Sequence, residues 1–243
     1  MITRLESGDS VMLYDPSLCG NFTPEWFDPA HWRQLGALAG AAPGRGSTWF
    51  FATGGREYAL RHYRRGGLIG RFNPDFYLGS DPQRSRPFLE FSLLQQCRSA
   101  GLPVATPVAA RFTRVGRGYR GDLLTLRVPG AQTLATRLRE QRLSSDEWRA
   151  VGAIIASFHA AGVYHADLNA HNILFDVSGA TLLIDFDRGR LRPPGWWKDS
   201  NLARLRRSVC KIADTSPAVP VDEAGWAALL DGYFFGIERS AVR

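Results

Sequence analysis

One short stretch limits what this chain can fold into more than any other, because polar residues recur there at fixed offsets beside two apolar runs. In VYHADLNAHNILFD, His165 and Asp167 stand two residues apart. Asn172 follows five residues after Asp167, and Asp185 lies thirteen residues further on, in the apolar run LLIDFD. The pattern predicts a loop followed by two hairpin strands, with Asn172 and Asp185 on adjacent strands. Carboxylate and amide oxygens are ligands that Mg²⁺ prefers beside water and phosphate.

This constellation resembles the catalytic core of the protein-kinase superfamily. Phosphoryl transfer needs a carboxylate that receives or orients the attacking hydroxyl, and oxygen ligands that hold Mg²⁺ against the phosphates of ATP. The resemblance assigns the first, catalytic role to Asp167 and the metal-binding role to Asn172 and Asp185. His165 is interpreted as a buried orienting residue, and His171 as a bystander. The alternative is a set of ordinary turn residues, since Asp and Asn are common in turns.

The same resemblance implies an α+β fold, a bilobal protein-kinase-like fold that acts as one catalytic unit. We predict a mainly antiparallel β N-lobe, the nucleotide clamp, over residues 1–128 and a mainly helical C-lobe over 129–243. The C-lobe would hold the catalytic loop, the metal and the acceptor.

Local signals support this division. Two aromatic-rich runs, 49–53 and 57–63, predict a β-hairpin, and a helix is expected over 87–99, between Pro87 and Gly101. Short β-branched and Leu-rich stretches complete the first half as a sheet. In the second half, apolar residues at helical spacing predict helices over 131–141 and 146–161.

The kinase resemblance also implies nucleotide-binding residues in the first half. Gly44 and Gly46 precede the first clear strand, where a phosphate-covering loop would lie, although Gly-x-Gly is frequent in turns. Arg61 stands where kinases carry the Lys that holds the α- and β-phosphates, and Glu90 is placed to pair with it. The alternatives are a solvated strand residue for Arg61 and, for Glu90, a carboxylate that stabilises the first turn of its own helix.

Composition narrows the classes of partner. The chain carries 30 Lys and Arg against 23 Asp and Glu, a net charge of +7, and only Lys198 and Lys211 are lysines. Arginine pairs with phosphate and carboxylate through two hydrogen bonds, so such groups are the expected partners. No nucleic acid is expected, because no RNP-like, helix-turn-helix or zinc-finger pattern accompanies the charge.

Cysteine usage and hydropathy bear on location. The three cysteines lie far apart, which predicts neither a disulfide framework nor a zinc site and favours a reducing cytoplasm. Glu6 and Asp9 interrupt the N-terminal stretch where a secretory signal needs apolar residues, and no run of about 18 apolar residues occurs. The sequence therefore predicts a protein that is neither exported nor membrane-spanning, while leaving a membrane surface open.

Departures from the protein-kinase pattern point to a small acceptor. Ala166 stands where regulated kinases have an Arg, and Asn169 stands where Ser/Thr kinases carry a Lys. No Ala-Pro-Glu follows Asp187, and fewer than sixty residues remain after it to build a groove for a protein. No protein substrate is expected.

Three further stretches carry a more specific resemblance: GRGSTWFF, LRHYRRGGLIGR, and LIDFDRGRLR together with WWKDSNLARLRRS. With the catalytic segment they span residues 44 to 211, and they resemble the lipopolysaccharide Kdo/heptose kinase family, most closely its 3-deoxy-D-manno-octulosonic acid (Kdo) kinases. The resemblance implies ATP and Mg²⁺ as cofactors and phosphate transfer to the 4-hydroxyl of Kdo on a Kdo-lipid A precursor. It also implies a peripheral place at the cytoplasmic face of the inner membrane.

A basic tract beside the catalytic strand is consistent with an anionic membrane surface as partner, at about 1 kcal/mol per basic residue near the surface. Its members are Arg188, Arg190, Arg192, Lys198, Arg204, Arg206, Arg207 and Lys211. Trp196 and Trp197 in this tract suit either the membrane interface or the core. Arg64, Arg65 and Arg71 offer a similar approach to phosphate in the first lobe.

Other functions stay open from the residues alone. The same catalytic residues would serve a kinase of a lipopolysaccharide heptose or of an aminoglycoside-type sugar. A pseudokinase that binds nucleotide or lipid without turnover is suggested by Arg61 in place of Lys and by Trp49 in place of a third loop glycine. Retention of Asp167, Asn172 and Asp185 argues against that reading.

Overall fold

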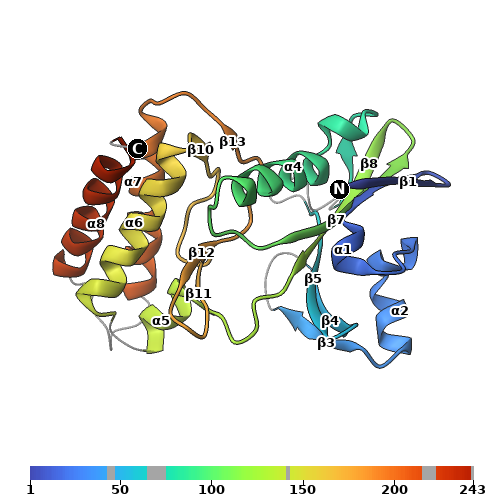
Figure 1. Ribbon diagram of the computed structural model, residues 1–243, viewed down its shortest axis with the longest axis horizontal. Coiled ribbons are helices and arrows are strands. Elements are labelled where there is room, and N and C mark those ends of the chain that lie inside the picture. Colours follow the sequence, from blue (N-terminus) through green and yellow to red (C-terminus); the bar gives the residue numbers. More distant parts are fainter. Residues whose placement is uncertain (43–46, 65–74, 141–142, 215–222, 242–243) are drawn as a thin grey trace. The chain divides into compact units, whose positions relative to one another are not determined.

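The chain divides into two compact units, residues 1–95 with 105–128 and residues 96–104 with 129–243 (Figure 1). The computed structural model describes residues 1–42, 47–64, 75–140, 143–214 and 223–241. Helix α4 (Arg86–Ser99) begins in the first unit, and its last four residues belong to the second.

The first unit is built on one antiparallel sheet, whose described strands run in the order β1-β2-β7-β8-β5-β4-β3, with β6 pairing with β8. The strands are β1 (Thr3–Ser7), β2 (Ser10–Tyr14), β3 (Leu38–Ala42), β4 (Ser47–Thr53), β5 (Arg56–His62), β6 (Tyr77–Leu78), β7 (Pro107–Val115) and β8 (Gly118–Leu126). Strands β4 and β5 form the predicted hairpin. Gly54 and Gly55 turn it with φ of 56° and 72°, which glycine adopts without strain.

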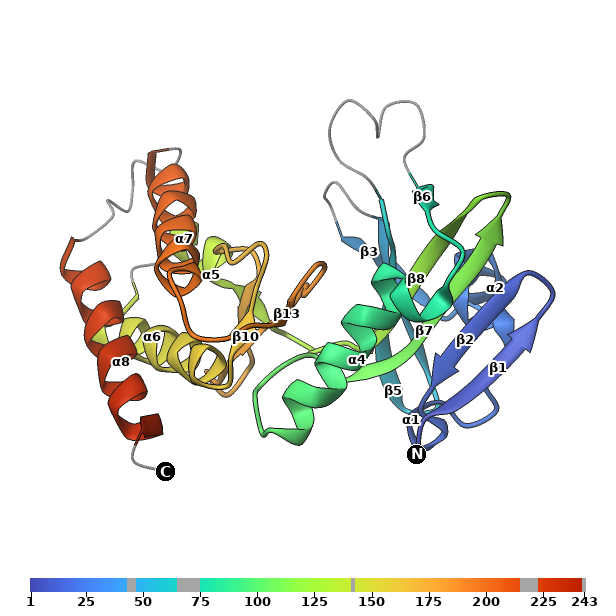
Figure 2. The ribbon, with the colours of Figure 1, turned by 90° about the horizontal axis from the view of Figure 1, so that it is seen from above.

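The two faces of this sheet are covered by different parts of the chain, because successive strand residues point to opposite faces. Leu60 joins an aromatic cluster with Trp26 and Trp32, whose ring stacks on Phe51 at 4.0 Å between centroids. Arg61, the next residue, contacts α4 instead, on the opposite face of the strands (Figure 2). The covering helices are α1 (Pro16–Cys19), η1 (Pro24–Phe27) and α2 (Pro29–Gln34), while η2 (Pro82–Arg84) precedes α4.

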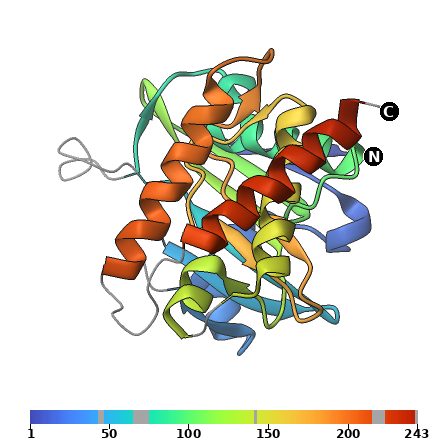
Figure 3. The same ribbon diagram turned by 90° about the vertical axis from the view of Figure 1, so that its left-hand side faces the viewer.

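The second unit is mainly helical, and Figure 3 turns it toward the viewer, with α7 in orange and α8 in red. Its helices are α5 (Leu134–Glu140), α6 (Ser145–Ala160), α7 (Trp197–Asp214) and α8 (Glu223–Ala241). Two small sheets accompany them: β9 (Gln132–Thr133), β11 (Ile173–Phe175) and β12 (Thr181–Leu183) form one, and β10 (Val163–Tyr164) and β13 (Arg190–Leu191) the other.

Helix boundaries follow local chemistry. Ser144 and Glu147 form a capping box that begins α6. α6 and α4 lie within a residue of the predicted ranges, whereas α5 begins three residues later than expected because Gln132 and Thr133 pair with β11 as a strand. Among the helices that the structure describes, none combines the length and the apolar character needed to cross a bilayer.

Candidate active site

The loop between β10 and β11 is braced by its own histidine. His165 Nε2 donates to the carbonyl of Ile184 at 3.0 Å, and its Nδ1 accepts from the amide of Asp167 at 3.1 Å. Burial lowers the pKa of His165, so the ring stays neutral with its proton on Nε2. These contacts agree with the interpretation of His165 as a buried orienting residue.

Two asparagines hold the backbone of Asp167 from the other side. The side-chain amides of Asn172 and Asn169 both donate to the carbonyl of Asp167, at 2.9 Å and 3.0 Å. Asn169 Oδ1 also accepts from the amide of His171 at 2.8 Å. The main chain of Asp167 is therefore fixed, while its carboxylate remains half-exposed.

The β11–β12 hairpin brings the two predicted metal ligands to one end of a small sheet. Ile173 pairs with Leu183, and the amide of Ile184 donates to the carbonyl of Asn172 at 3.0 Å, so Asn172 and Asp185 lie at the same end of the hairpin. Asp185 has φ of 61°, a left-handed conformation that is strained for a residue with a side chain. Such strain tends to persist where function requires it.

The donor chemistry of this end fits Mg²⁺. The amide nitrogen of Asn172 is used within the loop, which leaves Oδ1 available as a ligand, and Asp185 adds a carboxylate. The described residues contain no group of three or more His, Cys, Asp or Glu side chains that would enclose a metal by themselves. A cation held by one amide and one carboxylate must complete its shell with water and phosphate oxygens, as Mg²⁺ does and structural Zn²⁺ does not.

An arginine of the basic tract contacts Asp167 directly, a role that the sequence does not indicate. Arg204 Nη1 on α7 pairs with Asp167 Oδ1 at 2.5 Å, and both side chains are about half exposed, at 47% and 50%. The only signal in the sequence is helical spacing between Asn201, Arg204 and Ser208, which is visible once α7 is known.

In the first unit, Arg61 and Glu90 form an ion pair. Glu90 is 2% exposed, and Tyr63 Oη donates to its Oε2 at 2.5 Å. Arg61 Nη2 also donates to Tyr63 Oη at 3.0 Å. Arg61 is therefore anchored rather than a solvated strand residue, and Tyr63 is a partner that the sequence did not indicate. Gly44 and Gly46 lie outside the described residues.

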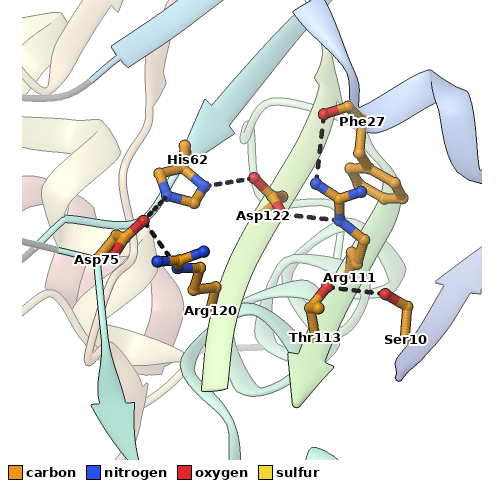
Figure 4. A network of polar contacts seen from close by, with 8 residues as sticks. All are labelled: Ser10, Phe27, His62, Asp75, Arg111, Thr113, Arg120 and Asp122. Carbon is orange, nitrogen blue, oxygen red and sulfur yellow. Dashed lines mark hydrogen bonds and ion pairs between the residues drawn. The ribbon is translucent and has the colours of Figure 1, made fainter. Parts of the chain in front are cut away.

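On the opposite face of the same strands, a second polar network surrounds His62 (Figure 4). His62 contacts Asp122 through Nδ1 at 2.7 Å and Asp75 through Nε2 at 3.2 Å. Arg111 Nε donates to Asp122 at 2.9 Å, and Arg120 pairs with Asp75 at 3.0 Å. The hydrogen bond with Asp122 raises the pKa of His62, so this network joins two carboxylates through a histidine that favours its charged form.

The two tryptophans of the basic tract have different environments. Trp197 is buried in the second unit, and its Nε1 donates to the carbonyl of Pro193 at 2.7 Å. Trp196 is 76% exposed. The interpretation as a core residue therefore holds for Trp197 and is wrong for Trp196. Arg65 and Arg71 of the first lobe lie outside the described residues.

Comparisons with known proteins identify the family of this chain. Residues 29–233 match the lipopolysaccharide kinase (Kdo/WaaP) family. A 3-deoxy-D-manno-octulosonic acid kinase from Vibrio vulnificus (strain CMCP6) is 40% identical over 96% of this chain and 98% of its own. Another from Xylella fastidiosa (strain 9a5c) is 44% identical over 79% of this chain and 75% of its own.

A solved structure supports the fold. The structure titled WaaP in complex with acyl carrier protein has a TM-score of 0.58 and covers 92% of this chain and 88% of its own, at 18% identity. The predicted α+β, protein-kinase-like fold is thereby confirmed, with an antiparallel sheet in one unit and helices in the other.

Proposed function

Because the chain belongs to the lipopolysaccharide kinase (Kdo/WaaP) family, we propose that it is an ATP-dependent sugar kinase that phosphorylates 3-deoxy-D-manno-octulosonic acid on a lipid A precursor. The observation that carries the proposal is the 40% identity, over nearly the whole chain, to a relative named for that activity. In this function the sugar is the acceptor, and its phosphate joins the inner core of a lipopolysaccharide.

Asp167 receives the proton of the attacking hydroxyl in this proposal. Its main chain is held by His165 and by two asparagine amides, and its half-exposed carboxylate is oriented by the pair with Arg204. A half-exposed carboxylate is accessible to an incoming sugar and can accept a hydrogen bond from its hydroxyl.

Asn172 and Asp185 are proposed to hold Mg²⁺, and the donor set described above supports this choice. When bound, Mg²⁺ neutralises charge on the nucleotide phosphates. Arg61, fixed by Glu90 and Tyr63, is proposed to bind nucleotide phosphate in place of the usual Lys, with Gly44 and Gly46 in the covering loop. Arg presents a planar fork rather than a point charge, so its contacts with phosphate differ from those of Lys.

We also propose which hydroxyl of the sugar receives the phosphate and where in the cell the protein acts. Transfer to the 4-hydroxyl rests on the resemblance of the three sequence stretches to Kdo kinases. A peripheral position at the cytoplasmic face of the inner membrane is supported by the basic tract and by Trp196, whose exposed ring suits a membrane interface. The residue ranges 1–128 and 129–243 are proposed to act as the two lobes of one catalytic unit.

The test is transfer of labelled γ-phosphate from Mg·ATP to a Kdo-lipid A precursor, beside the same lipid without Kdo. Label is expected on the Kdo-bearing lipid alone. Asp167→Ala is expected to lower turnover about 10²- to 10⁴-fold, the range for losing a positioned proton acceptor, while thermal unfolding stays close to wild type. Asp231→Ala, at an exposed site on α8, serves as the control and keeps wild-type turnover.

Each outcome separates one alternative. Label on a heptose or another sugar, but not on Kdo, would keep the kinase and discard this acceptor. No transfer to any acceptor by the wild-type protein would favour the pseudokinase. Near-normal activity of Asp167→Ala would refute the role of that carboxylate.

A further inference from the structure

A stripe of polar side chains on α7 holds this helix against the loop that carries Asp167. Asn201, Arg204 and Ser208 stand at positions i, i+3 and i+7, which places them on one helical face. Asn201 Nδ2 donates to the carbonyl of His165 at 2.9 Å, and Ser208 Oγ accepts from the amide of residue 170 at 3.2 Å. Arg204 lies between these two residues on the helix, so the two hydrogen bonds hold the helix backbone at Arg204 beside the loop that carries Asp167.

Arg204 is the positively charged residue that pairs with Asp167. The loop residue Asn169 carries no charge, and its side-chain amide donates one hydrogen bond and accepts one within the loop. Within the described ranges, no other Lys or Arg pairs with the Asp167 carboxylate, and Arg204 uses one guanidinium nitrogen, Nη1, for that pair. The remaining N–H donors of its planar fork have no partner among the described residues, and the group is 47% exposed.

An acidic acceptor needs such a cation. A sugar acid that offers a hydroxyl to Asp167 brings its own carboxylate toward the negative charges of Asp167 and Asp185, and like charges at short range repel. A guanidinium fork binds a carboxylate through two parallel hydrogen bonds. The acid group and the attacked hydroxyl belong to the same sugar, so both can be met by Arg204 and Asp167, which are in direct contact.

We propose that Arg204 is the acceptor-binding residue that takes the carboxylate of the sugar acid and thereby selects an acidic sugar. This inference rests on the proposed function. In the free protein Asp167 occupies one donor of Arg204, and the acceptor carboxylate takes the open donors, which leaves Asp167 placed for the hydroxyl. A lipid phosphate is the weaker candidate, because it is carried outside the sugar that reacts.

The experiment compares two acceptors and three proteins. The acceptors are the Kdo-bearing lipid and the same lipid with the Kdo carboxylate converted to a methyl ester; the proteins are wild type, Arg204→Gln and Arg206→Gln. We expect Arg204→Gln to raise the KM of the acid acceptor about 10- to 100-fold, the effect of losing a hydrogen bond to a charged group. The KM of ATP stays within about twofold.

The methyl ester removes the negative charge of the acceptor carboxylate and so tests its contact with Arg204. For wild type the ester raises the acceptor KM by a similar factor, whereas Arg204→Gln treats acid and ester alike. Arg206 is the matched control, since it lies on the same helix at 50% exposure but pairs with Glu223 on α8 at 3.0 Å. Arg206→Gln is expected to keep the wild-type preference for the acid.

Several results would overturn the proposal. One is an unchanged KM of wild type for the ester, a test that needs no variant and so does not depend on how Arg204→Gln folds. A second is an Arg204→Gln protein that still prefers the acid, and a third is a rise in the KM of ATP instead of the acceptor. Failure of wild type to phosphorylate any Kdo-bearing lipid is a different result, because it rejects the proposed function itself.

Discussion

Two histidines show how differently their surroundings treat the same side chain. His62 meets carboxylates through both ring nitrogens, and the hydrogen bond with Asp122 raises its pKa. His159 lies between Tyr233 Oη at 2.9 Å and Asn201 Oδ1 at 3.4 Å, and burial lowers its pKa from 6.5 to about 4. The stability that His62 contributes is lost as pH rises through its folded pKa, whereas the stability linked to neutral His159 is lost as pH falls from about 6.5 toward 4.

His159 therefore makes the second unit sensitive to acid. Between pH 7 and pH 5 the unfolded chain binds a proton at this position and the folded chain does not, which lowers the free energy of unfolding by about 2 kcal/mol. We expect His159→Gln, which keeps a neutral hydrogen-bonding side chain, to lose this part of the pH dependence. Urea unfolding of both proteins at pH 7 and pH 5 measures it. An equal pH dependence in the two proteins would contradict the burial argument.

At the scale of elements, α6 and α8 pack with their backbones nearly in contact. A Cβ on Gly152 would lie 1.9 Å from the carbonyl oxygen of Leu229, and a Cβ on Gly232 would lie 2.2 Å from that of Arg149. Backbone atoms cannot move aside as a flexible side chain can. The two helices keep their spacing only if both positions remain glycine.

We expect Gly152→Ala to lower the free energy of unfolding by about 1–3 kcal/mol, the usual cost of overpacking, although alanine alone favours a helix by about 1 kcal/mol. Ala150→Ser, at an exposed position of α6, is the control and should change stability by about 0.5 kcal/mol or less. Chemical denaturation of the three proteins compares them. A Gly152→Ala protein as stable as wild type would show that the helices can separate without loss.

Elements with strong local signals were predictable from the sequence. The β4–β5 hairpin has aromatic runs around a Gly-Gly turn, and α6 has a capping box and apolar residues at helical spacing. The N-terminal segment is not predicted, because its short helices depend on Trp26 and Trp32 packing on sheet residues further along the chain, such as Phe51. Helix α7 was seen only as a basic tract, since its polar stripe is meaningful once the catalytic loop lies against it.

In the candidate site, too, contacts between residues close in sequence were predictable and contacts between distant residues were not. Asp167, Asn172 and Asp185 were singled out because their offsets reflect one loop and one hairpin, which are local in sequence. The Asp167–Arg204 pair joins residues 37 apart, and the network around His62 joins three strands and the segment before β6. Such contacts depend on tertiary packing, and no spacing rule in the sequence reports them.

The metal role of Asp185 predicts a property of the whole protein, since a ligand that binds only the folded state stabilises all of it. Mg·ATP at about one hundred times its Kd should add about 2.7 kcal/mol, which raises the Tm of a chain of this size by about 5–10 °C. In Asp185→Asn this rise should largely disappear, because the substitution removes the carboxylate charge from the proposed Asn172–Asp185 ligand pair. Thermal unfolding in the presence of ATP, once with Mg²⁺ and once with a chelator, measures this Mg²⁺-dependent rise in Tm. Asp231→Asn is the control and should keep the full rise in Tm. A full rise in Asp185→Asn would contradict the metal role of Asp185, but it would not bear on the proposed roles of Asp167 and Arg204.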